Sequence, residues 1–226
     1  MNWIANEDTI IFSPEFNEEL NIGLISGFAK LIFSDYTLNK KMFESYLNNK
    51  FNIFEHKKSK FNQNVSVLPN SLTHLSFGHF FDQDMSELPN SLTHLSFGYF
   101  FNQDVSELPN SLTHLTFGFN FNKSVSNLPL SLTHLTFGHC FNRDVSVLPP
   151  FLIHLTFGLY FNKDVSALPS SITHLTFGYC FNQDISILPL SITYLSLGYS
   201  FNQKFNIPSN IKYLKLNCNN LYIINS

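Results

Sequence analysis

The sequence predicts a mainly β solenoid in which each repeat contributes one strand and one coil. Residues 61–202 repeat with a period of 20, as FNQDVSxLPxSLTHLTFGxx. That period is too short for a pair of helices or a propeller blade. Within each repeat, apolar and polar residues alternate, which is typical of a strand with one buried face. We therefore expect Leu95 and Phe97 to point inward, and His94 and Ser96 to point outward.

Strand centres recur along almost the whole chain. The expected central apolar residues stand at positions 10, 31, 54, 75, 95, 115, 135, 155, 175, 195 and 214. Near the end of the chain, Ile211-x-x-Leu214-x-Leu216-x-x-Asn219-x-Leu221 fits the leucine-rich-repeat pattern L-x-x-L-x-L-x-x-N-x-L. The sequence thus predicts a leucine-rich-repeat-like, right-handed solenoid of about eleven coils of roughly 20 residues, with one parallel β-sheet face.

The chain is expected to form a single domain, 1–226. Residues 61–203 hold the regular repeats, residues 1–60 hold degenerate repeats, and residues 204–226 hold a last divergent repeat. Terminal coils cover the ends of the core and differ in sequence for that reason. We interpret residues 1–60 and 204–226 as capping repeats, and the coil at 51–60 matches the pattern least well.

The return segments between strands are expected to be extended or turn-like. Residues 82–91, for example, have no apolar stripe at helical spacing. Thin elements of this kind on the outer side predict a comparatively flat solenoid. A column of asparagines, from Asn62 to Asn202, is expected to cap turns or to hydrogen-bond along the stack. The column that begins at Asp84 is expected to satisfy turn amides, and the column from Gly78 to Gly198 to permit the bend after each strand.

The motifs also carry a family resemblance. Phe205-Asn206-Ile207-Pro208 stands in the last repeat, and Leu-Pro-x-Ser-Leu-Thr and Leu-Thr-Phe-Gly recur in the preceding copies. On these motifs the chain resembles the FNIP repeat, a leucine-rich-repeat relative abundant in social amoebae and giant DNA viruses. Members of that family often carry an F-box ahead of the repeats, which implies an adapter of a ubiquitin ligase. Repeat-like signatures here begin by residue 10, so we expect this chain to lack an F-box.

Composition argues against several functional classes. The chain has no run of 18 or more apolar positions and no basic segment followed by an apolar stretch at its start, so we expect no membrane span, no secretory signal and a cytoplasmic location. The net charge is −3 with 13 Lys and Arg, and we expect these cations to form no basic stripe, which argues against nucleic-acid binding. Cys140 and Cys180 lie two coils apart, too far for a disulfide, and are expected to be small buried hydrophobes.

A column of histidines is the most conspicuous chemical feature. Six repeats carry His at one outward-facing strand position and the next carries Tyr: His74, His94, His114, His134, His154, His174 and Tyr194. Three interpretations are open: a stacked neutral ladder, a recognition surface, or metal ligation. Two adjacent imidazoles without a third ligand or a nearby carboxylate make a weak site, so we expect no metal. Protonation near pH 6.5 would align like charges, so we expect lower stability or weaker partner binding below about pH 6.

Catalysis finds little support in the sequence. His94 and Ser96 share a face but lie about 7 Å apart along a strand, beyond the reach of a nucleophile and its base. An active site is also singular, whereas this chain offers near-identical copies of each residue. We therefore expect neither enzymatic activity nor a cofactor.

A second column of variable residues follows the repeated glycine. It consists of His79, Tyr99, Phe119, His139, Leu159, Tyr179 and Tyr199. The neighbouring column, from Phe80 to Ser200, is expected to lie partly in the core. Aromatic anchors dominate interface energetics. We therefore predict that the column directly after the glycine, except Leu159, contacts a partner together with the histidines.

The function predicted from these features is a non-enzymatic repeat scaffold that binds a protein through its exposed strand face. The partner is unidentified, and the chain is expected to be a monomer or an end-to-end homo-oligomer. Two alternatives remain. One is a structural solenoid that self-assembles through its ends, and the other is the ubiquitin-ligase adapter that the family resemblance implies.

Overall fold

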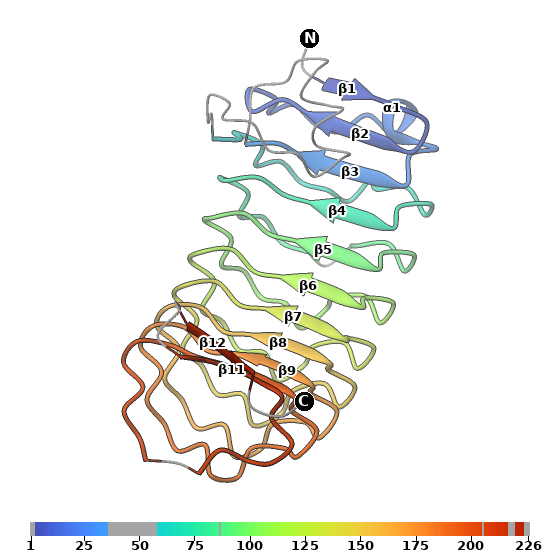
Figure 1. Cartoon of the computed structure of the whole chain (residues 1–226). Coiled ribbons are helices and arrows are strands. Elements are labelled where there is room, and N and C mark those ends of the chain that lie inside the picture. Colours follow the sequence, from blue (N-terminus) through green and yellow to red (C-terminus); the bar gives the residue numbers. More distant parts are fainter. Residues whose placement is uncertain (1–2, 36–57, 86, 205, 217–219, 224–226) are drawn as a thin grey trace.

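A computed structural model describes residues 3–35, 58–85, 87–204, 206–216 and 220–223 as one sheet with irregular return segments (Figure 1). Twelve strands lie side by side in sequence order, and the described residues contain one short helix, α1 (Ile22–Ile25). The strands are β1 (Trp3–Ala5), β2 (Thr9–Phe12), β3 (Lys30–Phe33), β4 (His74–Ser76), β5 (His94–Ser96), β6 (His114–Thr116), β7 (His134–Thr136), β8 (His154–Thr156), β9 (His174–Thr176), β10 (Tyr194–Leu197), β11 (Tyr213–Leu216) and β12 (Asn220–Ile223).

The body of the sheet is parallel, and one antiparallel strand lies at each end. Strands β2 to β11 pair in parallel, each with the next. β1 and β12 pair antiparallel with β2 and β11. The register sets equivalent residues opposite each other, as with His94 beside His114 and Leu95 beside Leu115. The predicted parallel solenoid is confirmed, whereas the two antiparallel end strands were not predicted.

The coils near the N-terminus are fewer than predicted. β2 and β3 pair through Ile10 and Leu31, as expected. The strand centre expected at residue 54 lies outside the described residues. β3 nevertheless pairs directly with β4, through Leu31 and Leu75, so no strand lies between them. Ten parallel strands with nine steps between them therefore replace the eleven expected coils.

Each coil is filled by the same small set of apolar side chains. In the coil that contains β5, Leu92, Leu95, Phe97 and Phe101 are all buried. The Phe97 and Phe101 rings stack with their centroids 3.6 Å apart, and an equivalent pair recurs in the neighbouring coils. One coil alone leaves both sides of these rings uncovered, so adjacent coils stabilise one another. Where they are described, the return segments of the regular coils contain turns but no helix, as predicted.

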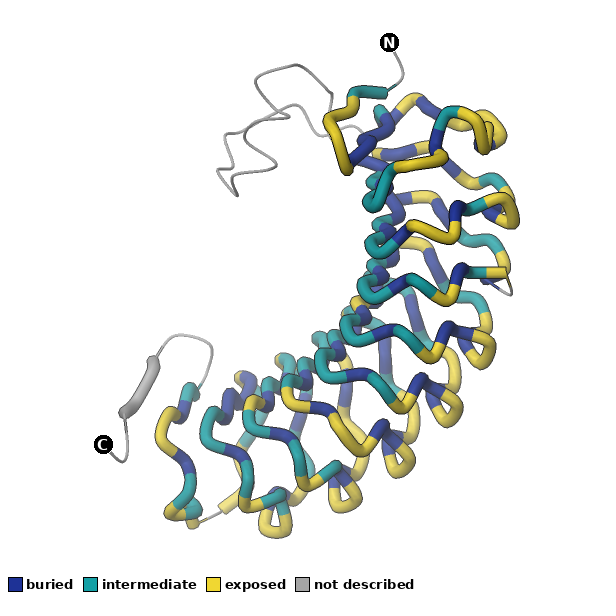
Figure 2. The backbone as a smooth tube through the Cα atoms, turned by 90° about the vertical axis from the view of Figure 1, so that its right-hand side faces the viewer, coloured by how far each residue is buried: buried dark blue, intermediate teal, exposed yellow. Residues whose placement is uncertain are grey.

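The solenoid bends into an arc with the strands on its inner side (Figure 2). The distance between equivalent ring centroids in neighbouring coils increases from the inner to the outer side. It is 4.1 Å for the histidines of β5 and β6, 5.8 Å in the Phe97 column and 6.2 Å in the Phe101 column. The expectation of a comparatively flat solenoid was wrong. The return segments are thin, but stacked phenylalanines hold the outer sides of the coils apart.

The glycine after each strand lets neighbouring coils touch. A Cβ added to Gly118 would collide with the carbonyl oxygen of Gly98, and the same collision recurs in every coil from Gly98 to Gly198. Among the described glycines only Gly27 has a positive φ. The glycine column is therefore required by close backbone approach between coils, and not by the bend that we expected.

Polar side chains on the return segments join successive coils. The backbone N–H of Asn122 donates to Oδ1 of Asn102 at 2.9 Å, and the contact recurs between neighbouring coils along this column. The carboxylate of Asp104 accepts a hydrogen bond from the backbone N–H of Ser106 at 2.7 Å and so closes a turn. These columns have the structural roles that the sequence predicted.

Candidate binding face

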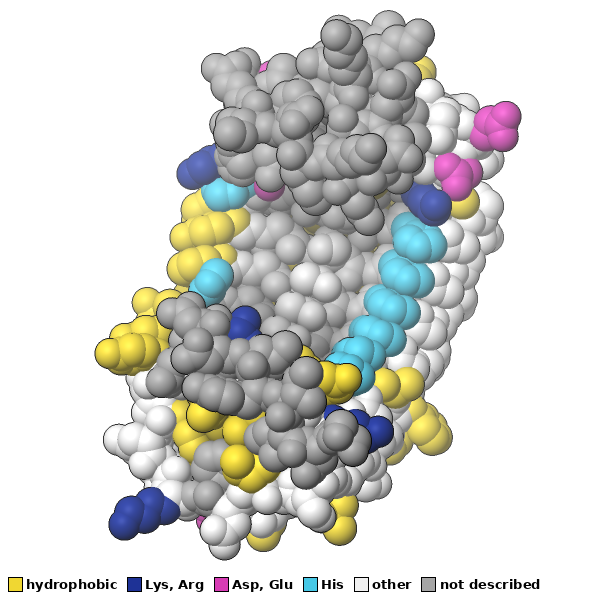
Figure 3. Space-filling model, in the orientation of Figure 1, with side chains coloured by type: hydrophobic (Ala, Val, Ile, Leu, Met, Phe, Trp, Pro, Cys, Tyr) yellow, Lys and Arg dark blue, Asp and Glu magenta, His cyan; other side chains and the backbone are white. Residues whose placement is uncertain are grey.

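Three columns of side chains run across the inner face of the arc. In Figure 3 a row of histidines follows one side of the hollowed face, hydrophobic side chains follow the other, and uncharged side chains lie between them. We call these the histidine column (His74, His94, His114, His134, His154, His174), the hydroxyl column (Ser76, Ser96, Thr116, Thr136, Thr156, Thr176) and the aromatic column (His79, Tyr99, Phe119, His139, Tyr179, Tyr199). The first two share one face because successive strand residues alternate between faces.

The imidazole rings of the histidine column stack face to face. Neighbouring centroids are 4.1–4.4 Å apart, and neighbouring planes differ by 11–23°. Tyr194 extends the column beyond His174. At the other end Lys30 lies in register with His74 and pairs with Asp8 at 3.2 Å. The rings cover each other's faces, so each inner ring offers its edge to a partner.

A threonine one residue before the histidine holds most of these rings. The distance between Thr Oγ1 and His Nδ1 is 2.8–2.9 Å in five coils, those of His74, His94, His114, His134 and His174. His154 is the exception, because Ile153 precedes it and has no hydroxyl. The contact fixes the ring orientation and leaves Nε2 without a hydrogen-bond partner among the described residues.

Burial lowers the pKa of five histidines in this column: His74, His94, His114, His134 and His154. The pKa of His94 falls to about 4, first because burial disfavours the charged ring and then because of the neighbouring histidines. Lys30 adds to the lowering of the pKa at His74. These five rings are therefore uncharged at pH 7, and their protonation begins at lower pH than the sequence suggested.

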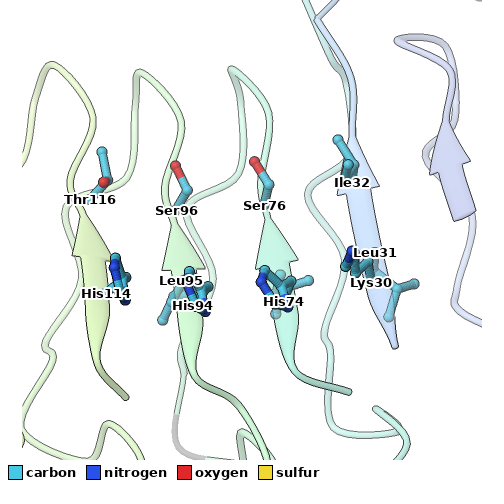
Figure 4. Close-up of a pocket in the computed structure, with 11 residues that line it drawn as sticks. Lys30, Leu31, Ile32, His74, Ser76, His94, Leu95, Ser96, His114 and Thr116 are labelled. Carbon is cyan, nitrogen blue, oxygen red and sulfur yellow. The ribbon is translucent and has the colours of Figure 1, made fainter. Parts of the chain in front are cut away.

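The hydroxyl column forms the floor between the other two. In the described part of the chain its six side-chain hydroxyls have no hydrogen-bond partner in the protein. A hollow of about 340 Å³ lies over β3 to β6. Figure 4 shows two rows of side chains that line this hollow, with Lys30 and Ile32 of β3 at one end. One row consists of His74, His94 and His114, and the other consists of Ser76, Ser96 and Thr116.

The aromatic column forms the opposite side of the face. Tyr99 stacks between His79 and Phe119, with centroid distances of 4.7 and 4.5 Å, so neither face of its ring is free to stack on a base or a sugar. Tyr179 and Tyr199 are 46% and 65% exposed and form the best-exposed aromatic pair of the column. His79 is only 7% exposed and so offers little surface to a partner.

The column next to the aromatic column is not core, contrary to our expectation. Phe80 and Phe100 are each 40% exposed, and Cys140 and Cys180 are only partly buried. The reason is local: the backbone N–H of Phe100 donates to the carbonyl of His79 in the previous coil at 3.0 Å. The backbone thus faces the neighbouring coil at this turn, and the core position moves one residue onward, to Phe101.

Sequence reasoning missed the hydroxyl column as part of the site. The signal was present, because Ser or Thr stands two residues after each histidine and strand alternation places both on one face. The sequence predicts that these residues face outward beside the histidines, but we assigned them no role in binding. The structure brings the histidine and hydroxyl columns together on one floor and sets the aromatic column along its edge.

The described residues contain no group of three or more His, Cys, Asp or Glu side chains placed to hold a metal ion. None of the helical structure described is long and apolar enough to cross a membrane. The described side chains of the inner face offer hydrogen bonding by imidazoles and hydroxyls, together with contact by aromatic edges.

Comparisons with known proteins agree with this architecture. A family model described as FNIP Repeat matches residues 61–100, 101–140, 141–180, 164–200 and 181–219. A crystal structure described as "CroV588 a novel circular LRR protein structure" is similar over 93% of this chain, with 42% sequence identity and a TM-score of 0.74. The match covers 33% of that protein, so the chain spans about a third of its length. No curated protein matches.

Proposed function

Because the chain belongs to the FNIP repeat family, we propose that it is a non-enzymatic repeat scaffold that binds a protein partner through the inner face of its sheet. The observation that carries this proposal is the hydroxyl column, which repeats in six coils without a partner among the described residues. Polar groups of the return segments, in contrast, bond to neighbouring coils or close turns.

The shape and chemistry of the face favour a protein over other partners. The backbone forms a concave arc (Figure 2), so its inner side suits a rounded surface better than a straight polymer. Nucleic acid is disfavoured because the described residues of the face hold no cluster of cations and because stacking covers both faces of Tyr99. Exposed aromatic side chains such as Tyr179 and Tyr199 supply the large contact area typical of protein interfaces.

Partner capture tests this proposal. The purified protein and the variant His94→Glu/His114→Glu/His134→Glu would each be used to retain proteins from host-cell lysate. We expect a protein that the wild type retains and the variant does not, because three carboxylates would change both the charge and the hydrogen bonding of the face. Capture of the same set by both would contradict the proposed binding face.

A matched variant controls for the added charge. Asn127→Glu/Val147→Glu/Ala167→Glu places the same number of carboxylates at a return-segment position where the repeat itself has Glu87 and Glu107. This control should melt at the wild-type temperature and retain the same partner. If it also loses the partner, net charge rather than the inner face determines capture.

A second candidate function is self-association through the ends of the solenoid. A similar protein is described as circular, and this chain is an arc that spans about a third of it. β1 and β12 are the edge strands of the described sheet, and open edges pair readily with other strands. A mass that rises with concentration in analytical ultracentrifugation would support this function, and a constant monomer mass would contradict it.

The family analogy adds an adapter role in a ubiquitin ligase, acting in the cytoplasm. The capture experiment tests it as well. Recovery of an F-box protein or a cullin-ligase subunit by the wild type would support the adapter role, and capture of an unrelated partner would count against it.

A further inference from the structure

We infer that the histidine column is locked in one tautomer, with the proton on Nδ1, and that the resulting row of Nε2 acceptors binds arginine or lysine side chains of the partner. The tautomer follows from the structure alone, whereas the partner chemistry rests on the proposed function. Together they specify which kind of protein surface the inner face accepts.

The tautomer is fixed because one threonine hydroxyl contacts both a backbone carbonyl oxygen and an imidazole nitrogen. Thr93 Oγ1 donates to the carbonyl oxygen of Thr73 in the previous coil at 3.1 Å and also lies 2.9 Å from Nδ1 of His94. A hydroxyl has one proton. Because that proton goes to the carbonyl, the second contact requires that Nδ1–H of His94 donates to Oγ1. Nε2 then carries the lone pair.

The same arrangement recurs in three other coils. In those of His74, His114 and His134, the threonine hydroxyl lies 3.1 Å from a carbonyl oxygen of the previous coil and 2.8–2.9 Å from Nδ1. Each of these carbonyl oxygens also accepts two backbone N–H groups, as that of Thr73 does from Thr93 and His94 at 2.9 and 3.0 Å. The opposite assignment would therefore not orphan the carbonyl, but it would make one hydrogen bond with the hydroxyl where the Nδ1–H assignment makes two. Four consecutive histidines therefore share one tautomer.

The chain contains its own exceptions. Ile153 cannot accept a proton, so nothing holds the tautomer of His154 through this contact. At His174 the threonine hydroxyl lies 3.4 Å from its carbonyl, so the lock is weaker there. The tautomer of His154 is therefore not fixed by this contact, and that of His174 is fixed less firmly, although both occupy places in the sheet equivalent to the other four.

The stacked rings point their Nε2 lone pairs the same way, since the planes from His74 to His134 differ by only 11–12°. Aligned lone pairs create a negative edge along the inner face. Burial lowers the pKa of these rings and keeps them neutral at pH 7. Such a row repels carboxylates and accepts N–H donors, and charged donors make the stronger hydrogen bonds. A guanidinium, with five N–H groups, can also reach the hydroxyl column.

Nitrogen-15 NMR of the imidazole rings tests the tautomer directly at pH 7.5. We expect His74, His94, His114 and His134 to show a protonated Nδ1 and an unprotonated Nε2, and His154 to differ. Protonated Nε2 in these four rings would overturn the inference. This result does not depend on any partner, so it separates failure of the tautomer from failure of the proposed function.

Binding of a labelled octa-arginine peptide tests the partner chemistry, with octa-glutamate as the opposite probe. The variant Thr93→Val/Thr113→Val/Thr133→Val keeps the net charge and the imidazoles but removes the lock. We expect it to bind octa-arginine about tenfold more weakly than the wild type, since one hydrogen bond to a charged group is worth at least that factor. Thr93→Ser/Thr113→Ser/Thr133→Ser keeps the hydroxyls and should restore binding.

Three outcomes would overturn the recognition half of the inference. They are equal octa-arginine binding by the wild type and the valine variant, failure of the serine variant to restore binding, and preferential binding of octa-glutamate. Circular dichroism before each titration would verify that the variants are folded. If the valine variant is unfolded, the single variant Thr113→Val replaces it, with Thr113→Ser as its control.

Discussion

The inner and outer sides of the arc are built from the same repeat but use their polar groups in opposite ways. On the return segments, Asn102 and Asn122 accept backbone hydrogen bonds from the next coil, and Asp104 closes a turn. On the inner side, Thr116 and Thr136 repeat with equal regularity and have no hydrogen-bond partner among the described residues. Regular repetition therefore does not by itself distinguish a structural column from a binding surface.

The two sides also differ in spacing. Histidine rings on the inner side stack at 4.1–4.4 Å, whereas the phenylalanines of the Phe101 column lie 5.9–6.3 Å apart. Large rings outside and glycines at the strand ends together bend the sheet. The outer columns thus determine the stability and the curvature, and the inner columns lie on the concave surface that results.

Removal of an outer ring should have the largest effect. Phe121 is fully buried and stacks in the outer column. Phe121→Ala should reduce the free energy of unfolding by about 3–5 kcal/mol, because it removes packing from two neighbouring coils. Urea denaturation would measure the change. Phe151→Ala is the matched control: Phe151 is 64% exposed, and its change should stay within about 0.5 kcal/mol. Equal effects of the two would contradict the comparison.

A methyl group added to the glycine column, where neighbouring coils touch, should have the next largest effect on stability. In Gly118→Ala the new methyl group would collide with the carbonyl oxygen of Gly98, so the coils must separate on the inner side. We expect a loss of about 1–3 kcal/mol in urea denaturation and a more open arc in small-angle X-ray scattering. Ser170→Ala, at an exposed return-segment position, should change neither measurement. A fully stable Gly118→Ala variant would refute the role assigned to the glycines.

Acid should destabilise the inner side before the outer side. The folded-state pKa of His94 is about 4, below the ordinary value of 6.5. Unfolded histidines therefore take up protons first, and the free energy of unfolding falls as pH drops from about 6.5 toward 4. The lowered pKa values of Asp104 and Asp144 act only below their ordinary value of 3.8. The melting temperature should be lower at pH 5 than at pH 8, and replacement of the histidines by Gln should remove the difference.

The sequence predicted most of the regular part of this fold, because one residue pattern repeated often enough to fix the strand phase. Leu95 and Phe97 are buried and His94 is partly exposed, as alternation required. The missed features depend on contacts between coils. The Gly98 carbonyl that excludes a side chain at Gly118 belongs to another repeat, and no pattern within one repeat reveals it.

The candidate site was predicted in part for the same reason. The histidine column could be recognised because its spacing and face follow from a single strand. The burial of His79 and the exposure of Phe100 could not, because both depend on how a turn of one coil hydrogen-bonds to the coil before it. The lock on His94 likewise requires a carbonyl from the neighbouring coil.

The comparison between the two sides is tested most directly by the free energy of unfolding of two triple variants. Asn122→Ala/Asn142→Ala/Asn162→Ala removes outer hydrogen bonds, and Thr116→Val/Thr136→Val/Thr156→Val removes inner hydroxyls while keeping the side-chain shape. We predict a loss of about 2–4 kcal/mol for the asparagine variant and a change within about 1 kcal/mol for the threonine variant. A threonine variant as destabilised as the asparagine variant would show that the inner hydroxyls hold the fold together, and would contradict their assignment to a partner.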